Sequence, residues 1–279
     1  MKRVLVMATL GVVTLAGFGA YDSASPRRGN AEASKPPLVV VMMENKDYSR
    51  IISSASAPYL NNTFLPQARV FTSYFAIEHP SLPNYLDIVS GSNQGCRRDG
   101  CPRGTYNVPS LFSQLTAAGI SWTAYNESML SNCALRSKGK YAVKHNPAPY
   151  FTTTTDCALN DVPGIPDAAT LPAFSFVTPN LCSDMHGHGG CPFRHDNIKN
   201  GDTWLAANID PLIAAGAEVV IVFDEGKPTN NVLCAVVGPG IAPESVSTVL
   251  DHYGLLAGIE TYFGLSKLGN AATATEVPL

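Results

Sequence analysis

The segment HPSLPNY at residues 79–85 places a serine hydroxyl where it could attack a phosphoryl group. Pro83 lacks an amide proton and has the fixed φ that suits a first helical turn. Ser81 is therefore expected just ahead of a helix N-terminus, where free backbone N–H groups and the helix dipole favour an anion. Asn84 follows one turn later. A capped helix with an ordinary turn serine would give the same local pattern, so the neighbouring clusters decide the interpretation.

Two polar pairs follow the two most hydrophobic runs of the chain. The runs LVVVMM and VVIVF end in Glu44 with Asn45 and in Asp224 with Glu225. Continuous apolar runs of this length fit strands buried on both faces, as in a parallel sheet covered by helices. The ligand crevice of such a sheet lies beyond the carboxyl ends of its strands. The two pairs therefore predict one metal site with oxygen ligands, although each pair alone could be a helix cap or a loop carboxylate.

Alternating strand and helix patterns position these clusters. Strands are predicted at residues 38–43, 70–75, 120–125, 173–178, 219–223 and 233–237. Helices are predicted near residues 57–65, 84–89, 110–118, 203–215 (opened by Asp202, with Trp204, Ile209 and Ile213 toward the sheet) and 252–263 (ending at Gly264). This alternation predicts an α/β fold in one domain, with a mostly parallel sheet sandwiched between helices. Residues 126–166 lack such periodicity and are expected to form a cysteine-rich insertion.

The N-terminal residues read as an export signal. Residues 1–20 combine Lys2 and Arg3 with an apolar stretch and small residues suited to cleavage, which predicts a signal peptide and a secreted protein. Residues 21–37 are small, polar and proline-containing and are predicted to be a disordered leader before the domain at 38–279. Removal of the two basic residues takes the formal charge from −3 to about −5. Neither a nucleic-acid partner nor a stable membrane anchor is expected.

Seven cysteines in an exported chain indicate disulfides. Pairing between sequence neighbours would join Cys96 with Cys101, Cys133 with Cys157 and Cys182 with Cys191, and would leave Cys234 as a buried free thiol. The alternative is a zinc site formed by Cys182, His186, His188 and Cys191, since thiolate and imidazole suit zinc. An oxidising compartment favours the disulfide.

Seven segments carry a family resemblance, and they occur in the family's order across most of the chain. They are MMENKDYSRII, EHPSLPNYLDIVSG, GKYAVKHNPAPYF, FSFVTPNLCSDMH, GDTWL, VIVFDEG and DHYGLLAGIE. The chain resembles the phosphoesterase family of bacterial secreted acid phosphatases and phospholipases C, within the wider alkaline phosphatase superfamily. It is most similar to short secreted acid phosphatases that act on phosphoinositides, which share the KHxP and PNxxxDMH segments.

The resemblance implies an alkaline phosphatase-like fold and specific roles for the polar clusters. One divalent metal ion would be held by Glu44, Asn45, Asp224 and Glu225. This all-oxygen set favours calcium, magnesium or manganese over zinc. Ser81 would be the nucleophile, with its hydroxyl made more acidic by the ion.

The resemblance also implies a substrate-binding set, which consists of His79, Asn84, Lys144, His145 and Asp184. Within it, Asn84 would hydrogen-bond a phosphoryl oxygen, and Lys144 with His145 would supply positive charge or protonate the leaving group. His186 or His252 would act as general acid, because an imidazole that titrates near neutral pH suits proton donation to the leaving oxygen. His188 and His195 are interpreted as loop residues.

Two features depart from the family pattern. Relatives often carry further carboxylates after the aspartate–glutamate pair, whereas Gly226, Lys227 and Pro228 follow it here. The His-Tyr pair is usually followed by serine, and here by Gly254. The first departure could alter metal affinity, and the second is expected to affect only helix capping.

These features together predict a secreted phosphatase that hydrolyses phosphate monoesters at acid pH through a phosphoserine. Phosphoinositides are included among the expected substrates. A phospholipase C that cleaves a phospholipid headgroup diester is the alternative within the enzyme class, although such enzymes tend to carry extra C-terminal modules. A catalytically silent protein that binds phosphorylated ligands is the other alternative. Retention of Ser81 and of both acidic pairs counts against it.

Overall fold

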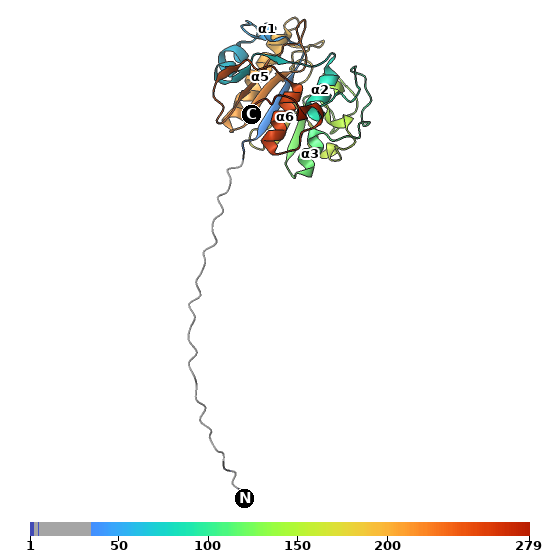
Figure 1. The fold of residues 1–279 in the computed structure, drawn as a ribbon, viewed down its shortest axis with the longest axis vertical. Helices are drawn as coiled ribbons and strands as arrows, with labels where there is room; N and C mark the ends of the chain where they lie inside the picture. Colours follow the sequence, from blue (N-terminus) through green and yellow to red (C-terminus); the bar gives the residue numbers. More distant parts are fainter. Residues whose placement is uncertain (3–4, 6–34) are drawn as a thin grey trace. The chain divides into compact units, whose positions relative to one another are not determined.

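The structure is a computed structural model that describes residues 1–2, 5 and 35–279. The rest of the predicted signal peptide and leader lies outside the described residues (Figure 1). The last leader residues are part of the folded unit, which runs from Lys35 to Leu279. The carbonyl of Pro37 accepts a hydrogen bond from Glu218 N at 2.8 Å, and that of Pro36 accepts one from the Tyr262 hydroxyl at 2.8 Å. The leader prediction was therefore too long at its C-terminal end.

An eight-stranded sheet forms the centre of the domain, with the strand order β5-β4-β6-β1-β7-β8-β2-β9. Its strands are β1 (Leu38–Met43), β2 (Arg69–Phe71), β4 (Trp122–Asn126), β5 (Asp161–Pro163), β6 (Phe174–Thr178), β7 (Glu218–Phe223), β8 (Cys234–Val237) and β9 (Glu244–Val246). β3 (Tyr74–Phe75) and β10 (Leu250–Asp251) form a separate parallel pair. Only β8 runs against its neighbours in the main sheet. The prediction of a mostly parallel α/β sheet is confirmed.

The two acidic pairs follow adjacent central strands. β1 pairs in parallel with both β6 and β7, with Val39 opposite Ser175 and Val219. Every residue of β1 and β7 is buried, as their continuous apolar runs predict. Met43 is in register with Phe223. Parallel register therefore brings the residues that follow both strands to the same edge of the sheet.

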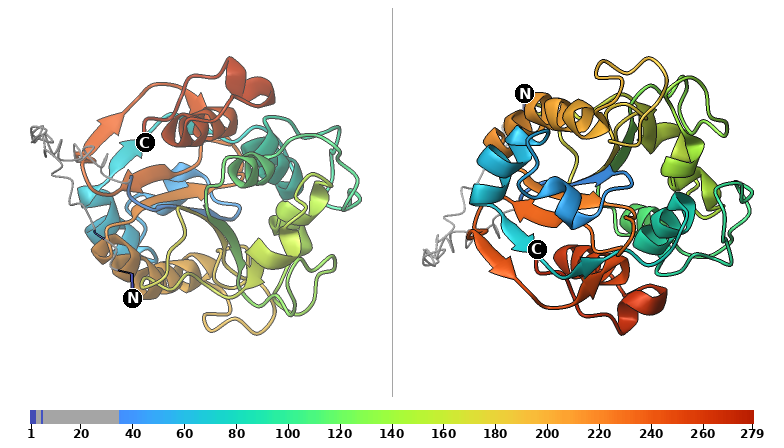
Figure 2. Two further views of the ribbon diagram at one scale, coloured as in Figure 1. Left: turned by 90° about the horizontal axis from the view of Figure 1, so that it is seen from below. Right: turned by 90° about the horizontal axis from the view of Figure 1, so that it is seen from above.

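Helices cover both faces of the sheet, so the sandwich prediction is also confirmed. They are α1 (Tyr48–Ile51), α2 (Ser81–Ser90), α3 (Leu111–Ala117), α4 (Cys157–Asn160), α5 (Asn197–Ala214) and α6 (His252–Phe263), with short 3-10 or π turns at Leu60–Phe64, Leu65–Gln67, Val143–His145, Ala148–Tyr150 and Gly269–Ala272. Figure 2 shows α5 and α6 on opposite faces of the sheet. Among the described residues, no helix is long and apolar enough to cross a membrane.

Helix α6 begins and ends where its local signals predict. Its N-cap, Asp251, accepts a hydrogen bond from Gly254 N at 2.9 Å, and Gly264 ends the helix with a φ of 68°. Gly254 has a packing role as well, because a Cβ atom there would lie 2.3 Å from the carbonyl oxygen of Thr275. The departure from serine at this position thus makes room for the C-terminal segment.

Two sequence-based boundaries were wrong because distant residues complete the local structure. The predicted strand at 70–75 divides into β2 and β3, which belong to different sheets. Helix α5 starts at Asn197 with Asp196 as its cap, rather than after Asp202. Asp202 instead lies inside α5 and accepts hydrogen bonds from the backbone N–H groups of Tyr59 and Leu60, both at 2.9 Å. Asp202 therefore binds the backbone of the turn at residues 59–60 and does not open α5.

The insertion at 126–166 is less irregular than expected. It contributes the edge strand β5, which pairs in parallel with β4, and the short helix α4. All three predicted disulfides are present, namely Cys96–Cys101, Cys133–Cys157 and Cys182–Cys191, and Cys234 is a buried free thiol. The Cys133–Cys157 bond joins the loop that follows β4 to the start of α4.

Glu260 of α6 gives the fold a pH-dependent stability. Its side chain is buried, Oε1 accepts the Leu268 N–H at 2.9 Å and Oε2 has no partner, so burial raises its pKa to about 7. The folded state therefore holds a proton that the unfolded state releases above its pKa of 4.5. Stability from this group is full below that value and is lost as the pH rises through 7.

We expect Glu260→Gln to make the free energy of unfolding less dependent on pH. The glutamine amide still offers an oxygen to the Leu268 N–H but does not bind or release a proton. The free energy of unfolding of the wild type should fall by up to about 1.4 kcal/mol more per pH unit than that of the variant between about pH 5 and 7. Urea unfolding at several pH values measures the difference. Parallel pH profiles for the two proteins would contradict the assignment.

Candidate active site

Ser81 is the first residue of α2. The sequence analysis had placed it one position earlier relative to the helix, just ahead of the first turn. Pro80 is the N-cap and has no side-chain hydrogen bond to offer. Pro83 occupies the third helical position, which it tolerates because none of the first four N–H groups has a partner inside the helix. The Leu82 N–H is satisfied from elsewhere, by Asp99 Oδ1 at 3.2 Å. Ser81 thus lies at a helix N-terminus, as required, although the predicted start at Asn84 was too late.

The hydroxyl of Ser81 faces both predicted acidic pairs. Its Oγ donates to Glu44 Oε2 at 3.0 Å and lies 3.4 Å from Glu225 Oε1. The other member of the first pair, Asn45, donates its side-chain amide to Glu44 and its backbone N–H to Asp224 Oδ1 at 2.9 Å. The four residues predicted as metal ligands therefore surround one hydroxyl, although they come from two strands far apart in the sequence.

Negative charge is concentrated and buried at this point. The side chains of Glu44, Asp184 and Asp224 are fully buried, and Glu225 is nearly so. Burial and mutual repulsion raise the pKa values of Glu44 and Asp184 well above their usual range and that of Asp224 to about 7. Asp224 Oδ2 has no hydrogen-bond partner. An orphaned carboxylate oxygen within such a cluster fits a divalent cation, which would compensate the charge and let all four groups ionise.

Tyr85 is a site residue that the sequence analysis did not single out. Its hydroxyl donates to Glu44 Oε1 at 2.6 Å, and its ring stacks on that of His145 at 5.3 Å between centroids. The signal was available, because Tyr85 follows Ser81 by four residues and such residues share one helix face. Tyr85 therefore fixes the orientation of Glu44, the carboxylate that also accepts from Ser81.

His145 and Asp184 form a second group beside Glu44. The Nε2 atom of His145 lies 3.2 Å from Glu44 Oε1, and its Nδ1 lies 3.4 Å from Asp184 Oδ2. These three side chains offer ligand atoms close enough together to hold a metal ion. Burial lowers the pKa of His145 well below its usual value, so the neutral imidazole available for ligation is favoured.

The hydrogen bonds of Asn84 do not favour the phosphate-binding role that the sequence analysis gave it. Its side chain is fully buried, with Oδ1 accepting from the N–H groups of Ile77 and Glu78 and Nδ2 donating to the carbonyls of Glu78 and Pro80. All four hydrogen bonds go to the backbone of the preceding loop. No donor is left for a phosphoryl oxygen, so Asn84 holds the loop that carries His79 instead.

Lys144 is close to the site but is not free. Its ammonium donates to Asp99 Oδ2 at 2.9 Å, and the same carboxylate accepts the Leu82 N–H. Asp99 therefore joins Lys144 to the helix turn that carries Ser81. The loop that presents Asp99 is closed by the Cys96–Cys101 disulfide. This placement holds the Lys144 ammonium near the turn that carries Ser81, and the role of Lys144 in phosphate binding stays a prediction.

The two candidate general acids, His252 and His186, differ in the burial of their rings and in the nitrogen atoms left free. His252 is fully buried, with Nδ1 2.9 Å from the Tyr74 hydroxyl and Nε2 2.8 Å from the Asp224 carbonyl oxygen. Both ring nitrogens are occupied, so this geometry does not support proton donation to a leaving group by His252. His186 is only partly buried and has one ring nitrogen, Nδ1, 3.0 Å from the Gly187 carbonyl. The structure favours His186.

His79 lies at the outer side of the site. Its ring contacts the Glu225 carboxylate through Nδ1, and 42% of its side chain is exposed. A pocket of about 270 Å³ opens beside the acidic pairs and is lined by Asn45, Lys46, Asp47, Arg50, Gly226 and Lys227. Three of these side chains are cationic. Gly226 also allows a close approach, because a Cβ atom there would lie 2.5 Å from Asp47 Oδ1.

The disulfide Cys182–Cys191 excludes the zinc alternative for that loop, because its sulfur atoms are bonded to each other. The bond encloses the segment with His186 and His188. His188 is exposed and bonds only the carbonyl of Gly189, which agrees with its interpretation as a loop residue.

Comparison with solved structures first defines the class of fold. An alkaline phosphatase superfamily protein from Vibrio parahaemolyticus superposes with a TM-score of 0.61 and 10% identity, over 88% of this chain and 71% of that protein. A 2-O glycosaminoglycan sulfatase superposes with a TM-score of 0.58 and 12% identity, over 87% of this chain and 75% of that one. The chain therefore has the alkaline phosphatase superfamily fold.

The sequence comparisons identify the family within that class. The chain belongs to the Phosphoesterase family, whose pattern matches residues 55–228. It is 29% identical to a phosphatidylinositol-3-phosphatase of Mycobacterium tuberculosis, over 97% of this chain and 92% of that protein. It is 30% identical to a phosphate-repressible acid phosphatase of Penicillium chrysogenum, over 83% of this chain but only 60% of the fungal protein. The family resemblance is confirmed, and the chain is a phosphoric ester hydrolase.

Proposed function

We propose that the protein is a secreted, metal-dependent phosphatase that hydrolyses phosphate monoesters through a phosphoserine at Ser81. The observation that carries this proposal is the position of Ser81 Oγ, at the N-terminus of α2 and within hydrogen-bond distance of Glu44. A hydroxyl in this position is both activated by neighbouring acceptors and exposed to the positive end of a helix dipole. A silent binding protein would have no use for this arrangement.

The proposed metal ligands are Glu44, Asn45, Asp224 and Glu225. The orphaned Asp224 Oδ2 and the excess of buried carboxylates support one divalent ion there. When bound, such an ion would neutralise charge on the transferring phosphoryl oxygens and make the serine hydroxyl more acidic. Oxygen donors favour calcium, magnesium or manganese over zinc.

The chain's own residues then account for the transfer. Ser81 Oγ gives up its proton toward the adjoining carboxylates and forms a bond to phosphorus while the bond to the leaving oxygen breaks. Lys144, held by Asp99, and the cationic pocket at Lys46 and Arg50 would stabilise the charge of the phosphoryl group. Tyr85 keeps Glu44 oriented toward the serine throughout.

His186 is the proposed general acid. The Gly187 carbonyl accepts from Nδ1–H, so the protonated ring can donate its Nε2 proton to the leaving oxygen. Burial lowers the pKa of His186, which makes the proton easier to give. In the second half of the reaction, water gives a proton to the now neutral His186 and bonds to phosphorus while the bond from phosphorus to Ser81 Oγ breaks. Ser81 Oγ takes back the proton held by the adjoining carboxylates, and inorganic phosphate leaves. His252 acts as a positioning residue for the Asp224 backbone.

Phosphoinositides are the proposed lipid substrates and small phosphate monoesters the general ones. The relative from Mycobacterium tuberculosis is named for a phosphoinositide and the fungal relative as an acid phosphatase. Three disulfides support export, since such bonds persist in oxidising compartments.

A substrate panel tests the proposed function. Protein stripped of metal and reconstituted with calcium, magnesium, manganese or zinc would be assayed against phosphomonoesters, phosphodiesters and phosphatidylinositol 3-phosphate. We expect release of inorganic phosphate from monoesters, at rates that exceed diester cleavage by at least about 100-fold. Diester cleavage with release of diacylglycerol would replace the proposal with a phospholipase C. Tight binding of phosphate esters without turnover by any reconstituted form would indicate a binding protein.

A further inference from the structure

Exposed apolar side chains gather on the insertion at residues 126–166. Six large hydrophobic residues of the folded unit are exposed, and four of them lie in this insertion. Three are leucines, with exposed fractions of 65% at Leu130, 53% at Leu135 and 76% at Leu159. Single exposed leucines are ordinary, but a local concentration indicates a surface that meets an apolar partner.

The leucines come from two segments that the structure joins. The disulfide Cys133–Cys157 connects the loop that carries Leu130 and Leu135 to the first residue of α4, which carries Leu159. A hydrogen bond of 2.9 Å from Asn132 Nδ2 to the Ala158 carbonyl adds a second link. These two links hold α4, which carries Leu159, against the loop that carries Leu130 and Leu135, although the sequence separates the two segments.

Positive charge is mixed with these leucines. Residues 128–155 contain no aspartate or glutamate, whereas Arg136, Lys138 and Lys140 lie between the two leucine segments. The nearest carboxylates are already engaged or buried. Glu127 accepts the Asn180 N–H at 2.9 Å, Asp156 accepts from Thr116 and Asn160 at 2.7 Å each, and Asp161 is fully buried, with the amides of Asn126 and Asn146 at 2.7 and 2.8 Å. We call these leucines and cations the insertion patch, which consists of Leu130, Leu135, Leu159, Arg136, Lys138 and Lys140.

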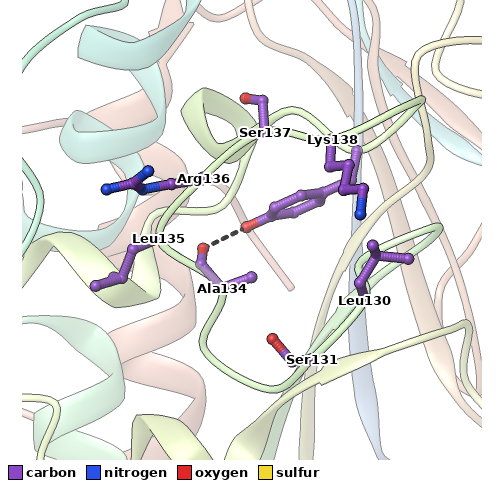
Figure 3. A pocket seen from close by; sticks show the side chains of 8 residues that line it. Leu130, Ser131, Ala134, Leu135, Arg136, Ser137 and Lys138 are labelled. Carbon is purple, nitrogen blue, oxygen red and sulfur yellow. Dashed lines mark hydrogen bonds between the residues drawn. The ribbon is translucent and has the colours of Figure 1, made fainter.

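The loop of the insertion patch is held in place rather than free. Met129, Tyr141 and Val143 form a small buried cluster beneath it. Tyr141 donates its hydroxyl to the Ala134 carbonyl at 2.9 Å. Above this cluster is a pocket of about 450 Å³, and Figure 3 shows Leu135 and Arg136 on one side of it and Leu130 and Lys138 on the other.

Hydrogen bonds connect the loop of the insertion patch to segments that carry active-site residues. Ser137 Oγ accepts the Val143 N–H at 2.9 Å, and Val143 begins the turn that carries Lys144 and His145. The Lys140 carbonyl accepts the Leu181 N–H at 3.0 Å, next to the loop that carries Asp184 and His186. Lys140 and His145 are five positions apart along the chain, a span of at most roughly 18 Å.

We propose that the insertion patch docks the protein reversibly on an anionic lipid bilayer. Leucines that enter the headgroup region and cations that meet acidic headgroups are the two contributions that bind interfacial proteins to membranes. Charge complementarity favours a bilayer with acidic lipids over a neutral one. That docking delivers phosphorylated headgroups to Ser81 rests on the proposed function, whereas docking itself does not require turnover.

Binding to substrate-free vesicles tests the docking. Sedimentation with vesicles of phosphatidylcholine, with or without phosphatidylserine, is compared for the wild type and two double variants. We expect binding only to the vesicles that contain phosphatidylserine. Arg136→Gln with Lys138→Gln should lower the partition coefficient roughly 30-fold. Leu130→Ser with Leu135→Ser should lower it at least about tenfold.

Matched variants outside the patch control for general effects. Val249→Ser removes another exposed apolar side chain, with 70% exposure, and Lys199→Gln removes an exposed cation of α5. Both should bind like the wild type. Failure of the wild type to bind, equal binding to both kinds of vesicle, or equal losses in control and patch variants would overturn the proposal.

A turnover assay separates this proposal from the proposed function. The patch variants should hydrolyse a soluble monoester at the wild-type rate and a vesicle-bound phosphoinositide more slowly, by the factor lost in binding. Vesicle binding without any turnover would leave docking intact and defeat the proposed function. Equal loss on soluble and vesicle-bound substrate would overturn the delivery of headgroups by this patch, because the variants would then damage the site itself.

Discussion

Replacement of Ser81 by alanine is expected to abolish phosphomonoester turnover while the protein stays folded. The hydroxyl is the only group removed, and the Leu82 N–H keeps its hydrogen bond to Asp99. The covalent route disappears with it. Loss of a nucleophile in unrelated hydrolases costs on the order of 10⁶ in kcat, and even a few orders of magnitude would be plain in an assay of released phosphate.

A second serine of the same helix provides the control. Ser90 lies at the other end of α2, where its hydroxyl bonds the Leu86 and Ser92 carbonyls. Ser90→Ala should keep near-normal activity, since this hydroxyl lies outside the site. Wild-type protein quenched during turnover should carry phosphate on Ser81, as mass spectrometry of its peptides can show. Near-normal turnover in Ser81→Ala, or a trapped phosphate on another residue, would make a water molecule the attacking group instead.

Asp224→Asn is expected to remove both bound metal and activity. The substitution removes the unpartnered anionic oxygen of Asp224 and leaves Glu44, Asn45 and Glu225 as an incomplete ligand set. Loss of an outer partner of a metal ligand already costs about 10–100-fold in affinity or activity, so loss of a direct ligand should exceed that. Metal content after dialysis, measured by mass spectrometry of the elements, gives a readout that does not depend on turnover.

Asp202→Asn is the matched control for this experiment. Asp202 is also a buried carboxylate, but it accepts hydrogen bonds from the backbone of residues 59 and 60. The Asp202→Asn substitution should lower the free energy of unfolding without changing the metal content. If Asp224→Asn retained a full equivalent of metal, or thoroughly stripped wild-type protein remained fully active, the proposed ligand set would be wrong.

Local sequence signals determined much of this fold. The apolar runs of β1 and β7 specified buried strands, because only strands covered on both faces can bury every residue of such a run. The parallel register between them then explains why Glu44 and Asp224, found at their ends in the sequence, meet at one edge. Helix α6 was delimited by its aspartate cap and by Gly264, which act within one turn.

The sequence also determined the family and the residues that surround Ser81. Motif types and their order identified Ser81 and the two acidic pairs, since the chemistry of phosphoryl transfer restricts which side chains can stand there. The three disulfides followed from pairing between neighbours along the chain.

Tertiary structure decided what each side chain of the site actually contacts. Asn84 and His252 have suitable chemistry, yet their hydrogen-bonding groups are taken by Glu78 and Pro80 and by Tyr74 and the Asp224 carbonyl. Asp202 is a good cap, but for a turn 142 residues away. A local pattern shows that a polar group needs a partner and leaves open which distant partner it finds.

Tertiary structure also decided which exposed residues share a surface. The net charge of −3 gives no sign of a cationic surface, and Leu130 and Leu159 are separated along the chain. A disulfide and the packing beneath residues 128–140 bring these leucines together with Arg136 and Lys138. Composition is an average over the whole chain, whereas a surface is defined by which residues the fold leaves exposed side by side.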